Sequence, residues 1–431
     1  MNTRLRLAIV LTAAVLLVAC KIEIQVPRFG KVASESGAFD CEAEQTCEID
    51  VVDQFFDETF SGEPGEGYRF VEWATFPGTF CGGASAPCRL TTAAFADHPH
   101  LLPFLDTDEL FYLRPVFERQ DLPAVAGLVF RSGFDSGTVH SRVTGTAQPC
   151  TDDLAGEDLL VSDAGDWEND LENPDGPFGQ FHFCFGGGTP AQRAIDLVED
   201  PDDALNQVLR GRIVEPNEVV RDDQVACNND ALGARKARIQ ALLKDNHNLP
   251  QFNYRLRMRL GEAFEAIVAE GQAINWMTIG EFWNNLPAEQ NTFRVTLNLV
   301  KDAVQNGPLY FGLKAEKKND GEPKWIRVWP EGDTATDVLV PIGEWFTLEV
   351  SVIEGDESSG RVVVRMTTAE GKTHTVADVT DWTYSPDGIP DGFKDLNPIK
   401  LYTSGALMCE LKSRGLPLEV WWDDFAIGTG E

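Results

Sequence analysis

The stretch at residues 251–260, QFNYRLRMRL, is where residue types and spacing first suggest chemistry. Its polar positions hold Arg255, Arg257 and Arg259, and apolar residues alternate with them. Residues two apart on a strand share a face, so a strand here presents three guanidinium groups side by side. Such a face is unfavourable unless a polar or anionic group covers it. In a chain with a formal net charge of -33, this local basic face indicates contact with a polar, acidic polymer such as a polysaccharide.

Residues on both sides of this stretch suit the same kind of ligand. KARIQALL supplies Arg238 and Gln240, and INWMTIGEFWNN supplies Glu281, Trp283 and Asn285. Aromatic rings stack on sugar rings, and amides hydrogen-bond to sugar hydroxyls. The alternative for the tryptophans is a place in the core.

Length and charge restrict the class of protein. At 431 residues the chain is long enough for more than one domain. Lys and Arg total 36 against 69 Asp and Glu, which argues against nucleic-acid binding. The acidic balance suits an exported protein and allows cation binding. The sequence predicts no oligomeric state.

The first residues resemble a bacterial lipoprotein signal. Arg4 and Arg6 precede an apolar run from Leu7 to Ala19, too short to span a bilayer, which ends at Cys20. This resemblance implies removal of residues 1–19 and lipidation of Cys20, which gives durable membrane anchoring. Lys21 follows instead of Asp, which implies the outer membrane or the cell surface. The alternative is an ordinary secretion signal that happens to end at a cysteine.

The remaining cysteines are even in number, and an exported chain can oxidise them. Cys41 with Cys47, and Cys81 with Cys88, are close enough in sequence to pair locally. The pairing of four others stays open; these are Cys150, Cys184, Cys227 and Cys409. No spacing predicts a zinc site.

Two β domains are expected. Residues 20–119 read as a small β domain, and the element with Gly67, Tyr68, Phe70 and Trp73 resembles the divergent InlB-type B-repeat of bacterial surface proteins. That resemblance implies a β-grasp-like module. Residues 122–429 read as about a dozen short strands separated by Gly, Pro, Asn and Asp, which predicts a β-sandwich. Helical patterns are limited to 262–270 and 407–414.

The larger region resembles the concanavalin A-like lectin/glucanase superfamily. The motifs that carry the resemblance extend from RSGFDSGT at residue 131 to WWDDF at residue 421. It implies a mainly β fold with a large jelly roll, in a superfamily that includes lectins, hydrolases and polysaccharide lyases. Fold alone does not choose among these activities.

The lyase comparison implies specific roles. Such enzymes neutralise a uronate carboxylate with Arg, Gln or Asn and use Tyr or His as the base. Here Tyr402 would be the base and Arg238 or Arg257 the neutralising group. Glu281-Phe282-Trp283 stands where Gln-x-His is expected, so the histidine of the motif is missing. The full set expected to contact a glycan is Arg238, Gln240, Arg255, Arg257, Glu281, Trp283, Asn285, Lys400 and Tyr402. A hydrolase needs a second carboxylate. GDWEND, at residues 165–170, supplies acids spaced two apart, which share a face if the piece is a strand; the alternative is a loop.

A calcium site is also expected from the superfamily. Asp135, in the GFDSG turn, and Asp423 and Asp424, in WWDDF, are the candidate ligands for a structural Ca²⁺. The alternative is exposed acids or turn caps.

These patterns together predict a lipid-anchored surface protein whose jelly roll binds extracellular polysaccharide. The first alternative is a lyase that cleaves an acidic glycan by β-elimination. The second is a non-catalytic adhesion or structural protein.

Overall fold

The computed structural model describes residues 20–107, 109–134, 139–142, 150–155, 176–185, 187–204, 206–217, 227, 236–284, 292–318 and 324–430. The chain divides into two compact units, Met1–Leu122 and Pro123–Glu431, called here the N-terminal and C-terminal units. The division falls close to the boundary expected from the sequence.

The N-terminal unit contains small sheets around its own core. Its elements are β1 (Cys20–Gln25), β2 (Gly30–Ser34), β3 (Thr46–Val51), β4 (Asp57–Pro64), β5 (Tyr68–Trp73), β6 (Cys88–Thr91), the 3₁₀ helices η1 (Ala93–Ala96) and η2 (Pro99–Asp106), β7 (Leu110–Leu113) and β8 (Pro115–Arg119). β1 lies between β3 and β7. Ile24, Phe60 and Trp73 are fully buried. Disulfides join Cys41 to Cys47 and Cys81 to Cys88, as the sequence predicted.

The C-terminal unit is built on two large sheets. Within its described residues the wide sheet has 11 strands and the narrow sheet has 8. The wide sheet contains β10 (Val139–Arg142), β11 (Cys150–Ala155), β12 (Gln180–Cys184), β15 (Lys236–Lys244), β17 (Ile274–Asn284), β18 (Thr292–Lys301), β19 (Tyr310–Lys318), β20 (Ile326–Trp329), β21 (Ala335–Leu339), β25 (Phe393–Asn397) and β26 (Lys400–Ser404). The narrow sheet contains β9 (Leu128–Ser132), β13 (Arg193–Glu199), β14 (Gln207–Ile213), β16 (Gln251–Leu260), β22 (Trp345–Ile353), β23 (Arg361–Thr368), β24 (Thr373–Thr380) and β27 (Leu418–Gly428).

The two sheets pack face to face through their apolar sides. Phe252 of β16 meets Phe282 of β17 with ring centres 5.0 Å apart. Phe311 of β19 meets Phe346 of β22 at 6.0 Å. Alternate residues of each strand point into this shared core. The mainly β, sandwich-type fold predicted from the sequence is therefore confirmed.

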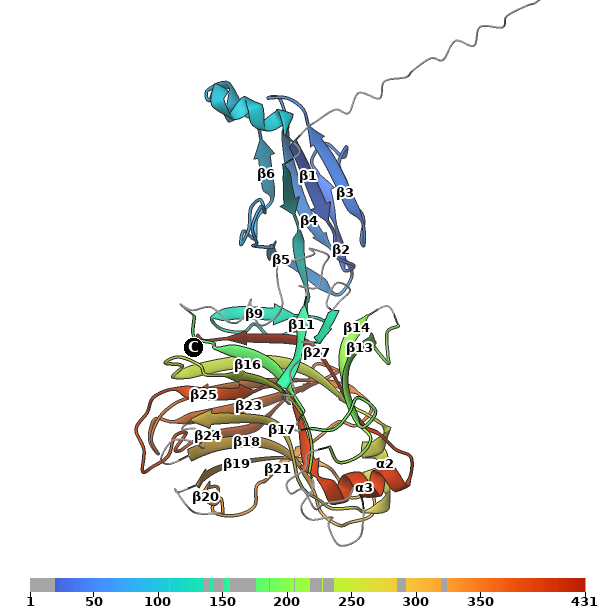
Figure 1. Ribbon diagram of the computed structural model, residues 1–431, viewed down its shortest axis with the longest axis vertical. Helices are drawn as coiled ribbons and strands as arrows, with labels where there is room; N and C mark the ends of the chain where they lie inside the picture. The colour runs from blue at the N-terminus through green and yellow to red at the C-terminus, as the bar shows by residue number, and fades with distance from the viewer. Residues whose placement is uncertain are drawn as a thin grey trace, which may run out of the picture. The chain divides into compact units, whose positions relative to one another are not determined.

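Helices are few in the described residues of this unit, and Figure 1 shows α2 (Glu262–Glu270) and α3 (Gly405–Ser413) at one end of the sandwich. α2 matches its prediction and ends at Gly271, whose φ of 75° suits a residue without a side chain. α3 begins earlier than predicted because Ser404 caps it by accepting a hydrogen bond from the Leu407 backbone N–H. The helices in the described ranges are all too short or too polar to cross a bilayer.

Two further findings concern the cysteine pairing that the sequence left open. Cys227 is bonded to Cys409, which lies in α3. Cys184 is also disulfide-bonded, and the backbone register of β11 and β12 places Cys150 opposite it.

Candidate functional site

The outer side of the wide sheet, which faces away from the core, is predominantly polar. In β18, Phe293, Val295 and Leu297 are buried in the core, so the alternating Arg294 and Thr296 point to the other side. The same alternation in β15, β17, β19, β25 and β26 places polar and aromatic residues beside them. We call this surface the polar face; its main residues are Lys236, Arg238, Gln240, Trp276, Thr278, Glu281, Trp283, Arg294, Thr296, Asn298, Lys314, Glu316, Asp395, Asn397, Lys400 and Tyr402.

Strand register brings together residues that are far apart in sequence. Arg238 of β15 lies opposite Tyr402 of β26, and Gln240 lies opposite Lys400. Tyr402 in turn lies opposite Thr278 of β17. Residues directly opposite in an antiparallel pair have neighbouring side chains on one side of the sheet. The structure therefore brings together Arg238, Gln240, Lys400 and Tyr402, all of which the sequence singled out.

Tyr402 lies among positive charges. Lys236 Nζ is 5.2 Å from its ring centre, Lys400 Nζ 5.3 Å, and the Arg238 guanidinium carbon 5.7 Å. The ring of Trp276 meets it edge-on with centres 5.0 Å apart. Cations near the face of an aromatic ring are attracted to its electron-rich surface. This part of the polar face combines an aromatic platform with groups that attract anions.

Glu281 lies between two cations. Its side chain is buried and forms ion pairs with Lys400, which is also buried, and with Arg294, whose Nη1 is 2.9 Å away. Burial alone would raise the pKa of Glu281, but the charges of Lys400 and Arg294 outweigh it and lower this pKa to about 2. Burial lowers the pKa of Lys400. Glu281 is thus a permanently ionised anchor for two cations and is unsuited to serve as a general acid.

A second aromatic platform surrounds Arg294. Its guanidinium carbon lies 3.9 Å from the centre of the Trp325 ring and 5.6 Å from that of Trp283. Glu316 accepts a hydrogen bond from Arg294 Nη2 at 2.8 Å and is also paired with Lys314 at 2.8 Å. With carboxylates holding it from two sides, Arg294 is fixed in position between the tryptophans.

Asp395 is the carboxyl of this face whose pKa is raised, in contrast to Glu281 and Glu316. It lies opposite Trp283 in the register of β25 and β17. Burial raises its pKa to about 6, and the charges of Asp245 and Glu281 add to this effect. The polar face therefore becomes more positive in mildly acidic solution.

Some buried polar atoms of the polar face have no hydrogen-bond partner among the residues that the structure describes. They are Gln240 Oε1, where Gln240 is 7% exposed, and Asn397 Oδ1, where Asn397 is 1% exposed. A buried acceptor without a partner is costly.

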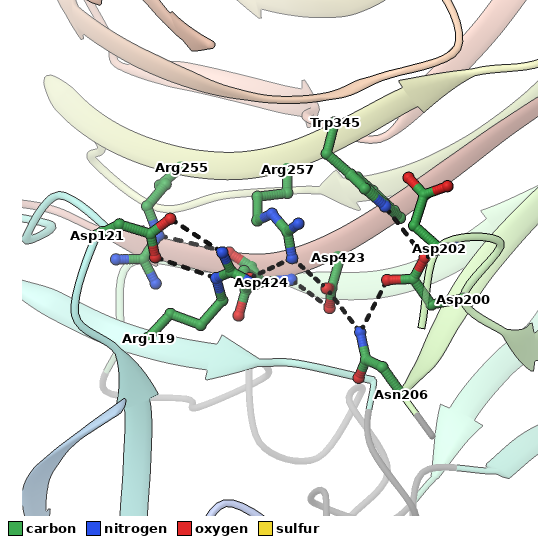
Figure 2. Close-up of polar contacts among 10 residues, drawn as sticks. All are labelled: Arg119, Asp121, Asp200, Asp202, Asn206, Arg255, Arg257, Trp345, Asp423 and Asp424. Atoms are coloured by element: carbon green, nitrogen blue, oxygen red, sulfur yellow. Dashed lines mark hydrogen bonds and ion pairs between the residues drawn. The ribbon is translucent and has the colours of Figure 1, made fainter. Parts of the chain in front are cut away.

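The arginines of β16 lie elsewhere, which corrects the expectation that Arg255 and Arg257 contact the same ligand as Arg238. β16 belongs to the narrow sheet, where it pairs with β22 and β27. Figure 2 shows Arg257 directed at Asp423 and Asp424, with Nη1 to Oδ2 distances of 2.8 and 3.2 Å. Arg255 donates to backbone oxygens, including that of Pro123. The anionic cover expected over these arginines is supplied by the protein itself.

The calcium prediction falls on the same cluster. Asn206 Nδ2 lies 3.2 Å from both Asp423 and Asp200, and Trp345 donates to Asp200 at 3.1 Å (Figure 2). Burial and the neighbouring Asp424 raise the pKa of Asp423. Among the described residues, no group of acids, histidines and cysteines is arranged to hold a metal. Asp135, the third expected ligand, and Asn285 of the glycan set lie outside the described residues.

Sequence reasoning missed several residues of this face, among them Arg294 and Asp395, and it also missed Trp325, which packs on Arg294. Arg294 lies in TFRVTLNLVK, which alternates as clearly as QFNYRLRMRL does, so the same pattern was available to find it. Trp325 immediately precedes β20, and no local pattern relates it to Trp283. Asp395 depends on pairing between β25 and β17, which no local pattern predicts.

Comparisons with known proteins give neighbours of low similarity. No family model matches the chain, and no curated protein matches it. Similar solved structures include an alginate lyase from Aplysia kurodai, with a TM-score of 0.35 and 8% identity over 55% of this chain and 87% of that one. An endo-β-1,4-glucuronan lyase from Trichoderma reesei has a TM-score of 0.30 and 14% identity over 55% and 87%. An exolytic alginate lyase from Zobellia galactanivorans has a TM-score of 0.30 and 10% identity over 68% and 95%. At these TM-scores the likeness assigns no function.

Proposed function

We propose that the polar face binds an acidic polysaccharide. The observation that carries this proposal is a local reversal of charge. Five cations, Lys236, Arg238, Arg294, Lys314 and Lys400, share the face with three carboxylates, Glu281, Glu316 and Asp395, in a chain whose formal net charge is -33. An acidic protein gains nothing in solubility from such a cluster, whereas an anionic ligand is attracted to it.

The remaining residues of the face fit the other parts of a sugar. Rings of Tyr402, Trp283 and Trp325 offer flat apolar surfaces for pyranose rings. Gln240 and Asn397 contribute amide groups to this face, and their buried oxygens have no hydrogen-bond partner within the described part of the chain. A neutral polysaccharide would use the rings and amides alone. The cations therefore favour a polysaccharide that carries carboxylates or sulfates.

β-Elimination is the second candidate, favoured by the position of Tyr402 beside Arg238 and Gln240. In this reaction a base removes the proton on the carbon next to the uronate carboxylate. The electron pair left behind forms a carbon–carbon double bond and expels the glycosidic oxygen, which takes up a proton. In this second proposal Tyr402 moves that proton, and Arg238 stabilises the negative charge that develops on the uronate.

We further propose that the protein is held at the outer membrane or cell surface by lipid on Cys20. Cys20 is half-buried and is the free cysteine of the described residues. It follows the apolar run Leu7–Ala19 directly. Mass spectrometry of the membrane-extracted protein tests this: the expected N-terminal peptide begins at an acylated Cys20, and an unmodified Cys20 overturns the proposal.

The function is tested by incubating the soluble chain from Lys21 with uronate-containing, sulfated and neutral polysaccharides, with and without Ca²⁺. Binding and ultraviolet-absorbing unsaturated product are recorded together. Binding to acidic chains without product supports the first proposal, and product supports β-elimination. If neither occurs across the panel, the glycan proposal fails and a non-catalytic adhesion role replaces it.

A further inference from the structure

The end of the N-terminal unit at which β1 begins is built from three segments. Cys20, the first residue of β1, lies opposite Val51, the last residue of β3. The loop that follows β3 is fixed by Thr92 Oγ1, which donates to the Asp53 carbonyl at 3.0 Å. Lys21 N donates to the Glu109 carbonyl at 2.9 Å, just after η2. Figure 1 shows η2 across one end of this unit. These contacts place the post-β3 loop and η2 around Cys20.

Large apolar side chains are exposed on these segments. Val52 is 61% exposed and Phe55 79%, both in the loop after β3. Leu102 is 36% exposed and Phe104 48%, both in η2. Among the described residues of the N-terminal unit, these four are the exposed large hydrophobic side chains, and they all lie on the segments that meet Cys20. An exposed apolar cluster of this kind marks a contact surface. We call these four residues the apolar tip.

The residues that precede Cys20 indicate what the apolar tip contacts. The apolar run Leu7–Ala19 ends at Cys20 without a polar linker, and Cys20 is already part of β1. A membrane anchor attached at Cys20 therefore has no slack, because each chain residue reaches at most about 3.6 Å. Whatever holds Cys20 at a bilayer also holds the apolar tip against it.

We propose that the apolar tip inserts into the interfacial region of a lipid bilayer and so seats the N-terminal unit on the membrane. This proposal extends the proposed lipid anchor, but it concerns side chains that act without it. Asp53, Asp97, Asp106 and Glu109 are all exposed on the same segments. Their charges disfavour anionic headgroups, so the surface that fits is zwitterionic and the binding is apolar in origin.

The test uses the chain from residue 20 with Cys20→Ser, so that no lipid is attached. Flotation with zwitterionic phosphatidylcholine–phosphatidylethanolamine vesicles measures the partition coefficient. Phe55→Ser and Phe104→Ser are each expected to lower it about fivefold to tenfold, as expected for loss of a partly inserted apolar side chain. Ile389→Ser is the matched control, because Ile389 is 73% exposed and lies in the C-terminal unit; it is expected to leave partitioning unchanged.

Three outcomes of the flotation test count against the proposal. Failure of the Cys20→Ser chain to float with vesicles overturns it, as does equal partitioning of the parent and the two phenylalanine variants. Binding that appears only with anionic lipid and disappears in salt shows an electrostatic contact and also overturns it. If the apolar tip binds vesicles while native Cys20 proves unmodified, the anchor fails and the proposed seat on the bilayer stands.

Discussion

Arg238 and Tyr402 lie directly opposite each other in the antiparallel pair of β15 and β26, with the guanidinium carbon 5.7 Å from the ring centre. Sheet register, not closeness in sequence, makes this pair. The same register places Gln240 opposite Lys400. Arg238, and not Arg257, is therefore the arginine that shares a surface with the tyrosine.

Replacing Arg238 by Ala is expected to weaken binding of a uronate-containing polysaccharide about tenfold to hundredfold, because a hydrogen bond between charged groups is worth about 1.5–3 kcal/mol. Titration calorimetry at low salt measures the change. Arg361→Ala is the control, since Arg361 is exposed on the narrow sheet and paired with Asp378. An equal loss in both variants would show that binding follows overall charge rather than this site.

Replacing Tyr402 by Phe separates binding from chemistry. The ring and its stacking surface stay, so the affinity for the glycan is expected to change less than about threefold. If the hydroxyl transfers the proton, its loss is expected to lower the rate of elimination about 100-fold or more. Initial rates of ultraviolet absorbance on the bound glycan measure the second effect. If the parent forms product and Tyr402→Phe forms it equally fast, Tyr402 is not the base.

Lowering the pH from 7 to 5.5 is expected to strengthen glycan binding about threefold, because it protonates Asp395. The pKa of this carboxyl is raised to about 6, chiefly by burial. Sugar carboxylates with ordinary pKa values near 3.5 stay ionised over this range. Asp395→Asn is expected to bind tightly at both pH values.

The same shift carries a stability effect of defined sign. A carboxyl whose folded pKa lies above its ordinary value of 3.8 stabilises the fold below that value and loses this contribution as pH rises through about 6. In urea unfolding from pH 4 to pH 7, the parent should therefore show a free energy of unfolding that decreases as the pH rises. The Asp395→Asn variant should lack this decrease. An unchanged pH profile in both measurements would show that Asp395 does not titrate here.

Glu281→Gln is expected to cost about 3–5 kcal/mol of unfolding free energy, because it leaves Lys400 buried without its anionic partner. The pKa of Glu281 is about 2, below the ordinary 4.5, because the charges of Lys400 and Arg294 outweigh the effect of burial. The contribution of ionised Glu281 to the free energy of unfolding is therefore present above about pH 4.5 and disappears as the pH falls toward 2. Urea unfolding measures it, and the double variant Glu281→Gln/Lys400→Met should recover part of the loss. No recovery would point to a packing defect instead.

The sequence was informative about alternation and uninformative about sheet membership. Alternation correctly placed Tyr254 and Met258 in the core and the β16 arginines on the opposite side. It did not show that β16 pairs with β27, because that pairing joins distant segments. Since β27 carries Asp423 and Asp424 to Arg257, the repulsion expected among the arginines is relieved internally. Conversely, the sequence predicts a strand around Arg294, but a single arginine on its polar side gave no sign that Glu281, Glu316 and two tryptophans meet there.

Arg257 gives the sharpest test of this distinction. Its side chain and that of Asp423 are 9% and 4% exposed, with Nη1 and Oδ2 2.8 Å apart. Arg257→Met removes the cation and leaves Asp423 beside Asp424, whose charge already raises the Asp423 pKa together with burial.

We expect Arg257→Met to lose about 3–5 kcal/mol in urea unfolding at pH 7 and to bind the acidic glycan as tightly as the parent at a temperature where both are folded. Part of the lost stability should return as the pH is lowered, because burial and Asp424 raise the pKa of Asp423 and its protonation removes the unpaired buried charge. Arg238→Ala should show the opposite behaviour, with affinity lost and stability nearly kept. If Arg257→Met instead loses glycan affinity while its unfolding is unchanged, the arginines of β16 take part in binding after all.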